Sequence, residues 1–160
     1  MRCYFLRHGL AADAQQWKGD DGDRPLTNEG KRRMEREAKT LAALDLEIEA
    51  IVTSPLLRAK QTAAIVAATL GLRDRAIEDE RLGFGFDANA LAAILRERAP
   101  TAAAVLLVGH EPSMSATIGA LAGAERIVLK KGGLACVDIS DESCSEGELV
   151  WLVPPKILTL

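Results

Sequence analysis

The sequence has little excess charge, few cysteines and few histidines, and each shortage narrows what the protein can be. A net charge of -3 on 160 residues gives no reason to expect binding to nucleic acid or to an anionic membrane. No apolar run approaches the roughly 20 residues that cross a bilayer. In the N-terminal stretch MRCYFLRHG only four apolar-leaning residues precede a charged pair, which is too short for the hydrophobic region of a secretory signal. Three cysteines without a CxxC or other zinc spacing, and only two histidines, argue against a metal centre. We therefore expect a cytoplasmic protein with reduced thiols.

The remaining composition is that of an ordinary globular protein, with 48% hydrophobic and 27% charged residues. We expect a single domain over residues 1–160, because this length can bury a full core and shows no linker or repeat. Hydrophobic and helical patterns alternate along the chain. They predict strands at 2–7, 50–54, 76–78 and 103–109, and helices at about 27–44, 57–70, 87–99 and 113–121.

The C-terminal part holds three closely spaced strand-like runs instead of further helices. These are RIVLK at 126–130, LACVDIS at 134–140 and ELVWLV at 148–153. Short connections favour antiparallel pairing of such runs. The whole pattern predicts an α/β fold, with helices on both faces of the sheet and antiparallel strands added at the end of the chain.

Three predicted strands end in polar residues: FLRHG, IVTSPLLRAKQTA and LLVGHEPSM. Ligands of open α/β sheets bind just outside the carboxyl ends of the strands. This placement is expected to bring four side chains to one crevice, namely Arg7, His8, Arg58 and His110. Two guanidiniums and two imidazoles suit a tetrahedral oxyanion, because arginine is a rigid donor fork that matches phosphate. Helix N-termini after the second and third of these strands would add backbone donors.

Simpler explanations exist for each residue taken singly. A lone histidine after a strand is more often a turn residue, and a lone arginine more often a surface ion-pair partner. The segment GDDGDR at 19–24 lacks the ligand spacing of a calcium loop and is expected to be solvated. Trp17 either covers part of the crevice or packs locally, and Trp151 is expected in the core. The coincidence of four polar residues at strand ends favours a functional site.

The motifs RHG at 7–9, RPLTNEG at 24–30, SPLLRAKQTA at 54–63 and GHEPSM at 109–114 resemble, in this order, those of the histidine phosphatase (phosphoglycerate-mutase-like) superfamily. They look most like the motifs of the small bacterial phosphohistidine phosphatases, the SixA-like group. The resemblance implies a three-layer α/β/α sandwich with a mostly parallel central sheet. It also implies that His8 is a nucleophile that becomes phosphorylated, and that the other three residues bind the phosphoryl group. Gly9 would let the backbone approach that group, with no metal or cofactor involved.

One position departs from many relatives, which carry a glutamate general acid in the segment that matches ERLGFGFD. The matching position here falls near Phe84, which cannot donate a proton. The carboxylates nearby are Glu80 and Asp87, more simply explained as a turn residue and a helix cap.

The leading hypothesis is a metal-independent phosphatase that acts on phosphohistidine in a phosphorelay-type protein. One alternative is a phosphatase for small phosphate esters that uses Glu80 or Asp87 as its acid. A mutase is less expected, because the chain is short and the acid is missing. A catalytically silent phosphate-binding module is the alternative from another class, although binding alone would not need His8.

Overall fold

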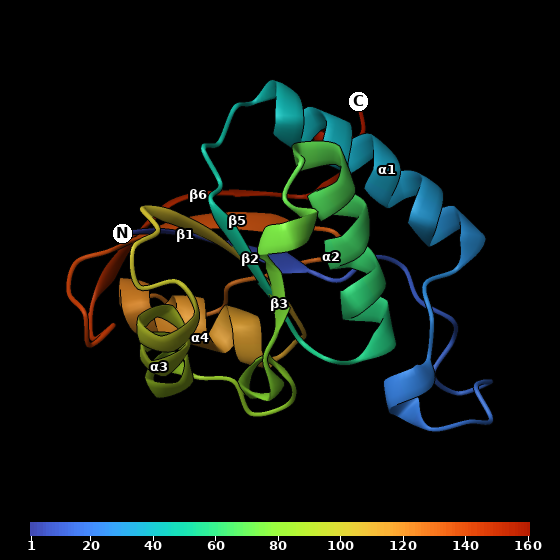
Figure 1. Cartoon of the computed structure of the whole chain (residues 1–160). Coiled ribbons are helices and arrows are strands. Elements are labelled where there is room, and N and C mark those ends of the chain that lie inside the picture. The colour runs from blue at the N-terminus through green and yellow to red at the C-terminus, as the bar shows by residue number, and fades with distance from the viewer.

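The computed structural model describes all residues from 1 to 160 and is built on one six-stranded sheet (Figure 1). The strand order is β3-β2-β4-β1-β5-β6. The strands are β1 (Arg2–Arg7), β2 (Ala50–Thr53), β3 (Ala76–Glu78), β4 (Ala104–Gly109), β5 (Leu134–Ile139) and β6 (Gly147–Val153). The first four pair in parallel, whereas β5 is antiparallel to β1 and β6 to β5. The expected α/β fold with antiparallel C-terminal strands is confirmed.

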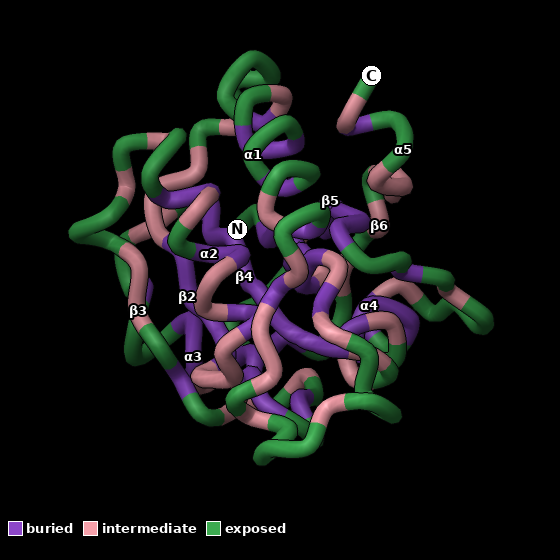
Figure 2. The backbone as a smooth tube through the Cα atoms, turned by 90° about the vertical axis from the view of Figure 1, so that its right-hand side faces the viewer, coloured by how far each residue is buried: buried purple, intermediate pink, exposed green.

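Helices cover both faces of this sheet and complete three layers. They are α1 (Asn28–Ala43), α2 (Leu57–Leu70), α3 (Ala88–Arg98), α4 (Ser113–Ala122) and α5 (Pro155–Leu158). Helices α1, α2 and α5 pack on one face, and α3 and α4 on the other (Figure 1). Alternate residues of β1 serve the two cores: Tyr4 and Leu6 face α1 and α2, while Cys3 and Phe5 face α3 and α4. Figure 2 shows the buried strand segments between exposed outer turns.

The helix boundaries follow from their capping residues, which the sequence displays. Thr27 accepts a hydrogen bond from the Gly30 N–H at the start of α1. Gly71 adopts the left-handed conformation, with φ of 70°, at the end of α2. The helices therefore begin and end within about one residue of the predicted positions. Four short helical segments were not expected: α5 and the 3₁₀ turns at Asp21–Asp23, Arg73–Arg75 and Glu80–Leu82.

The prediction of a strand at RIVLK was wrong. Both edges of β1 are already paired, with β4 and β5, so the segment has no free neighbour there. Arg126 has a positive φ of 60°, which breaks an extended run. The segment instead crosses the carboxyl end of β1, where the Leu129 carbonyl accepts a hydrogen bond from Arg7. No helix in the structure combines the length and apolar character that crossing a bilayer requires.

Candidate active site

His8 lies at the centre of the sheet, immediately after the last residue of β1. Its backbone N–H donates to the Gly109 carbonyl at the end of β4, and its side chain is only 5% exposed. The ring nitrogen Nδ1 lies 2.8 Å from the Gly9 carbonyl oxygen. Because a carbonyl oxygen only accepts, Nδ1 must carry the proton of this hydrogen bond, which leaves Nε2 with a free lone pair.

The lowered pKa of His8 also favours the neutral form of its ring. Burial is the main cause that lowers its pKa to about 3, with smaller contributions from His110 and the nearby arginines. A buried imidazolium would lose its hydration and face these positive charges. The ring is therefore neutral at physiological pH, and Nε2 is available as a nucleophile.

His110 follows β4 and lies beside His8, with 5.2 Å between the ring centroids. Its Nε2 lies 2.7 Å from the hydroxyl of Ser54, which directly follows β2. The Ser54 oxygen also accepts a hydrogen bond from the Leu56 N–H. Its hydroxyl hydrogen can then be donated to Nε2, and in that tautomer Nδ1 of His110 bears a proton. This Nδ1 is buried without a partner. Burial and then Arg58 lower the pKa of His110 to about 4.

Two arginines bring positive charge to the histidines. Arg58, in the first turn of α2, is almost fully buried and donates to the Asp21 carbonyl at 2.9 Å and to its carboxylate at 3.1 Å. Arg7 is half-buried and donates to the Leu129 carbonyl. The Nε of each guanidinium is buried without a hydrogen-bond partner. Unsatisfied buried donors of this kind are costly, so a site for an anion explains them.

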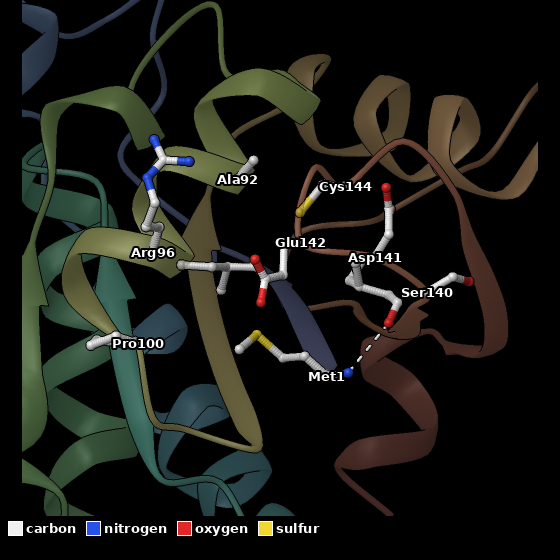
Figure 3. A pocket seen from close by; sticks show the side chains of 10 residues that line it. Met1, Ala92, Arg96, Pro100, Ser140, Asp141, Glu142 and Cys144 are labelled. Carbon is white, nitrogen blue, oxygen red and sulfur yellow. Dashed lines mark hydrogen bonds between the residues drawn. The ribbon is translucent and has the colours of Figure 1, made fainter.

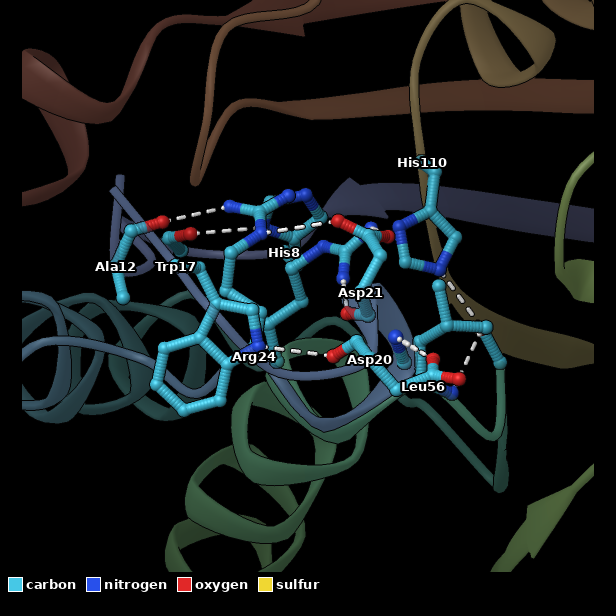
Figure 4. Close-up of polar contacts among 12 residues, drawn as sticks. His8, Ala12, Trp17, Asp20, Asp21, Arg24, Leu56 and His110 are labelled. Atoms are coloured by element: carbon cyan, nitrogen blue, oxygen red, sulfur yellow. Dashed lines mark hydrogen bonds and ion pairs between the residues drawn. The ribbon is translucent and has the colours of Figure 1, made fainter. Parts of the chain in front are cut away.

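His110 lies beside His8 but is not part of the wall of the cavity that the other three side chains line. This cavity, of about 970 Å³, is lined by Arg7, His8 and Arg58, and we call it the strand-end cavity. Phe84 also lines it, and its ring centroid lies 5.6 Å from that of His110. In Figure 4 the labelled side chains of His8, Asp21 and His110 lie close together. All four residues singled out in the sequence therefore come together; their chemical roles stay a prediction.

Two residues of this site were missed in the sequence. Arg24 lines the cavity and is held by the Ala12 carbonyl and the Asp21 carboxylate. The sequence could have indicated Arg24, because it is the first residue of the RPLTNEG motif. Asp21 belongs to the GDDGDR segment that was expected to be solvated; it is half exposed but contacts Arg58. Asp21 and Arg58 are 37 positions apart in the sequence, so no local sequence pattern could indicate that they are in contact.

The candidate general acids lie away from this cavity. Glu80 is exposed, and Asp87 caps α3 by accepting a hydrogen bond from the Ala90 N–H, as the simpler explanation expected. Neither of them lines the cavity, whereas Phe84 does. Glu111 is a carboxylate on the wall, but it accepts a hydrogen bond from the Ser115 N–H in α4. Phe84, near which the resemblance places the glutamate of other relatives, therefore brings an aromatic ring to the cavity wall.

Gly9 and the two tryptophans have structural explanations. A Cβ on Gly9 would lie 2.8 Å from Cγ of Met34, so close packing on α1 already requires glycine there. Trp17 is outside the cavity wall, and its indole N–H donates to the Asp20 carbonyl within the same loop (Figure 4). Trp151 is only partly buried, against Tyr4. Of the two explanations offered for Trp17, local packing fits.

A separate cavity of about 350 Å³ lies at the amino end of β1, beside Met1 (Figure 3). Ile139, at the end of antiparallel β5, forms another part of its wall, which places the cavity at the opposite end of the strand from His8. None of the predicted site residues lines it. The structure also has no group of three His, Cys, Asp or Glu side chains that could hold a metal ion.

Comparison with known proteins agrees with the motifs. The model of the histidine phosphatase superfamily (branch 1) matches residues 3–83. The phosphohistidine phosphatase SixA of Escherichia coli is 31% identical, with 97% of this chain and 94% of the relative covered. An uncharacterized protein of Picosynechococcus is 38% identical, with 99% of each chain covered. The structure of a protein histidine phosphatase SixA complexed with tungstate is 30% identical, covers 99% of each chain and superposes with a TM-score of 0.86.

The matches to the two relatives and to the solved structure span almost the whole chain. They include the ordered motifs whose side chains converge at the strand ends. The chain therefore belongs to the histidine phosphatase superfamily and is a SixA-like phosphatase.

Proposed function

We propose that the protein hydrolyses phosphohistidine on a phosphorelay-type protein, with His8 as the nucleophile. The observation that carries this proposal is the hydrogen bond from Nδ1 of His8 to the Gly9 carbonyl, because it leaves Nε2 unprotonated in a buried site. A module that only bound phosphate would gain nothing from a free imidazole lone pair among guanidinium donors.

The reaction proceeds in two displacements at phosphorus. The Nε2 lone pair of His8 forms a bond to phosphorus while the P–N bond to the substrate imidazole breaks, and that nitrogen keeps the bonding electrons and takes up a proton. Water then attacks this phosphorus while the P–Nε2 bond breaks; Nε2 of His8 regains its lone pair, and the proton lost by the water leaves with inorganic phosphate or passes to solvent. No metal or cofactor takes part in either step as proposed.

The other predicted residues stabilise the phosphoryl group during both steps. Phosphoryl transfer needs mainly positioning and neutralisation of the equatorial oxygens. The free donors of Arg7 and Arg58 supply this charge, and Nδ1 of His110 adds a hydrogen bond in the tautomer that Ser54 supports. By analogy with an oxyanion-hole donor, loss of Arg58 is expected to reduce kcat by about 10²-fold or more.

The leaving group determines which substrates this site can serve. Hydrolysis of an alkyl ester gains about 10²- to 10⁴-fold from a positioned general acid. Phe84 cannot act as one, and each carboxylate of the cavity wall already accepts a hydrogen bond: Asp13 from the Gln15 N–H, Asp21 from Arg24 and Arg58, and Glu111 from the Ser115 N–H. Imidazole needs less help, because its conjugate acid titrates at about pH 6.5. The site is therefore suited to phosphohistidine and poorly suited to alkyl phosphates, and the name of the Escherichia coli relative supports this choice.

A panel of substrates tests the proposal directly. Free phosphohistidine, a phosphohistidine-bearing phosphocarrier protein, an activated aryl phosphate and an alkyl phosphate are compared at equal concentration. We expect turnover in the order phosphohistidine, aryl ester, alkyl ester, and no turnover by His8→Ala, which still binds tungstate. Glu80→Gln and Asp87→Asn are expected to behave as wild type. Equal rates on alkyl phosphate and phosphohistidine, or loss of ester activity in either amide variant, would favour the small-ester phosphatase.

A further inference from the structure

A third cavity, of about 340 Å³, adjoins the strand-end cavity on the side of α1. The third cavity and the strand-end cavity share Arg7, Leu10 and Lys131 as a common wall. The third cavity adds Arg33 from α1 and Lys130 from the loop before β5. We call the surface formed by Arg7, Arg33, Lys130 and Lys131 the cationic groove.

The positive charge of the cationic groove is largely uncompensated. Lys130 and Lys131 are exposed and form no ion pair, and neither does Arg7. Arg33 pairs with Glu29, one turn earlier on α1, at an exposed position where such pairs are weak. This concentration of cations contrasts with the chain as a whole, whose net charge is -3.

The carboxyl group in the wall of the groove does not cancel this charge. Glu37 is 1% exposed, and its Oε2 has no hydrogen-bond partner. Burial raises its pKa to about 8, against smaller opposite effects of Arg33 and Arg36. Near neutral pH the group therefore keeps its proton in the folded protein. The groove thus presents cations to a ligand, with a neutral carboxyl group beneath them.

We infer that the cationic groove binds acidic side chains that flank the phosphohistidine of a protein substrate. This inference rests on the proposed function. One phosphoryl group is served by the donors of the strand-end cavity, so Arg33 on α1 and Lys130 in the loop before β5 are left for other negative groups of the substrate. An extended chain advances about 3.3 Å per residue. Residues a few positions from the phosphohistidine can therefore reach Lys130 and Arg33, whereas a small phosphate ester cannot.

Electrostatic complementarity of this kind acts mainly on association and on partner choice. Its contribution falls as salt screens exposed charges beyond about 10 Å at 0.1 M ionic strength. The preference for acidic flanks should therefore appear mainly in KM and weaken at high ionic strength. The chemical step at His8 should not depend on it.

Three probes phosphorylated with phosphoramidate separate docking from chemistry: free phosphohistidine, a peptide with Asp and Glu around its one histidine, and a peptide with Gly and Ser there. For the wild type we expect kcat/KM about 10-fold higher on the acidic peptide than on the neutral one, by analogy with electrostatically steered association. In R33E/K130E this preference should disappear, with turnover of free phosphohistidine within about twofold of wild type. R33Q/K130Q gives a milder version of the same change.

The double variant K39E/R73E is the matched control. Both of its residues are exposed, line neither cavity and form no ion pair, and the change in net charge is the same. It should keep the preference for the acidic peptide. Equal turnover of both peptides by the wild type, or an equal loss in the control, overturns the inference and leaves the proposed function intact. Failure to hydrolyse any of the three probes overturns both.

Discussion

Asp21 and Arg58 form a contact at the mouth of the strand-end cavity, through both the backbone carbonyl and the carboxylate of Asp21. The carbonyl contact orients the guanidinium. The carboxylate adds a negative charge beside the donors that are proposed to bind the phosphoryl group. These two effects can be separated, because an amide keeps the backbone contact and removes the charge.

Asp21→Asn is expected to bind tungstate or vanadate about 3- to 10-fold more tightly, as removal of one partly solvated negative charge nearby implies. The inhibition constant against an aryl phosphate measures this change. Asp23→Asn is the control, because Asp23 is exposed, forms no ion pair and does not line the cavity. Weaker inhibition of the Asp21 variant would mean that the carboxylate helps to bind the anion.

The two histidines should remain neutral far below the ordinary pKa of imidazole. Burial lowers the pKa of His8 to about 3 and that of His110 to about 4. A group with a lowered pKa stays deprotonated until the pH falls to that value, so neither ring should titrate between pH 8 and pH 5. Nitrogen-15 NMR of the imidazoles, assigned with His8→Ala, measures this and should show the proton of His8 on Nδ1. A midpoint near pH 6.5 for His8 would contradict the proposed nucleophile.

Phe84→Glu should place a carboxyl group without a hydrogen-bond partner at the wall of the strand-end cavity. Phe84 is 69% exposed at the cavity wall and close to His110, so a carboxyl group there can reach a leaving oxygen. We expect hydrolysis of an alkyl phosphate to rise by about 10-fold, less than the 10²- to 10⁴-fold of a well-positioned acid because an exposed side chain is held loosely, while phosphohistidine turnover changes little. Phe84→Gln controls for shape and polarity. An equal gain in the Gln variant would show that better access, and not proton donation, is the cause.

Glu37 should make the folded state less stable as the pH rises. Its pKa is raised to about 8 in the folded protein, against an ordinary value of 4.5, so between these values the unfolded chain has released a proton that the folded chain keeps. The free energy of unfolding should therefore fall with rising pH in this window, by at most about 1.4 kcal/mol per unit. Denaturant titrations of wild type and Glu37→Gln should differ in this slope, with exposed Glu35→Gln as the control. Parallel slopes would show that the carboxyl group is already ionised.

The parts of the site that follow strands could be predicted, because each strand carries its own signal. The hydrophobic runs before His8 and His110 are readable, and parallel strands bring their carboxyl ends to one edge. Arg58 follows from the same logic, since α2 starts just after β2.

Other parts depend on partners that no local pattern shows. The run at 126–130 has the composition of a strand. It cannot pair with β1, however, because β4 and β5 occupy both edges of that strand. Glu37 looks like a solvated helix residue until the loop at Gly132 covers it, with the position of a Cβ there only 2.7 Å from Oε1. Helix α5 has four residues, too few for any periodicity to appear.

The central position of β1 divides the site into two regions whose backbones are held to different extents. Both neighbours of β1 hold its backbone up to His8, whereas Asp21 and Phe84 lie on exposed segments outside the sheet. Amide hydrogen exchange should therefore be slowest in β1 below His8 and fastest at the segments of Asp21 and Phe84. Substitutions at the entrance then disturb little of the cooperative core. Natural variation at Asp21 and Phe84 can accordingly alter the entrance of the cavity while the sheet keeps His8, the proposed nucleophile, in place.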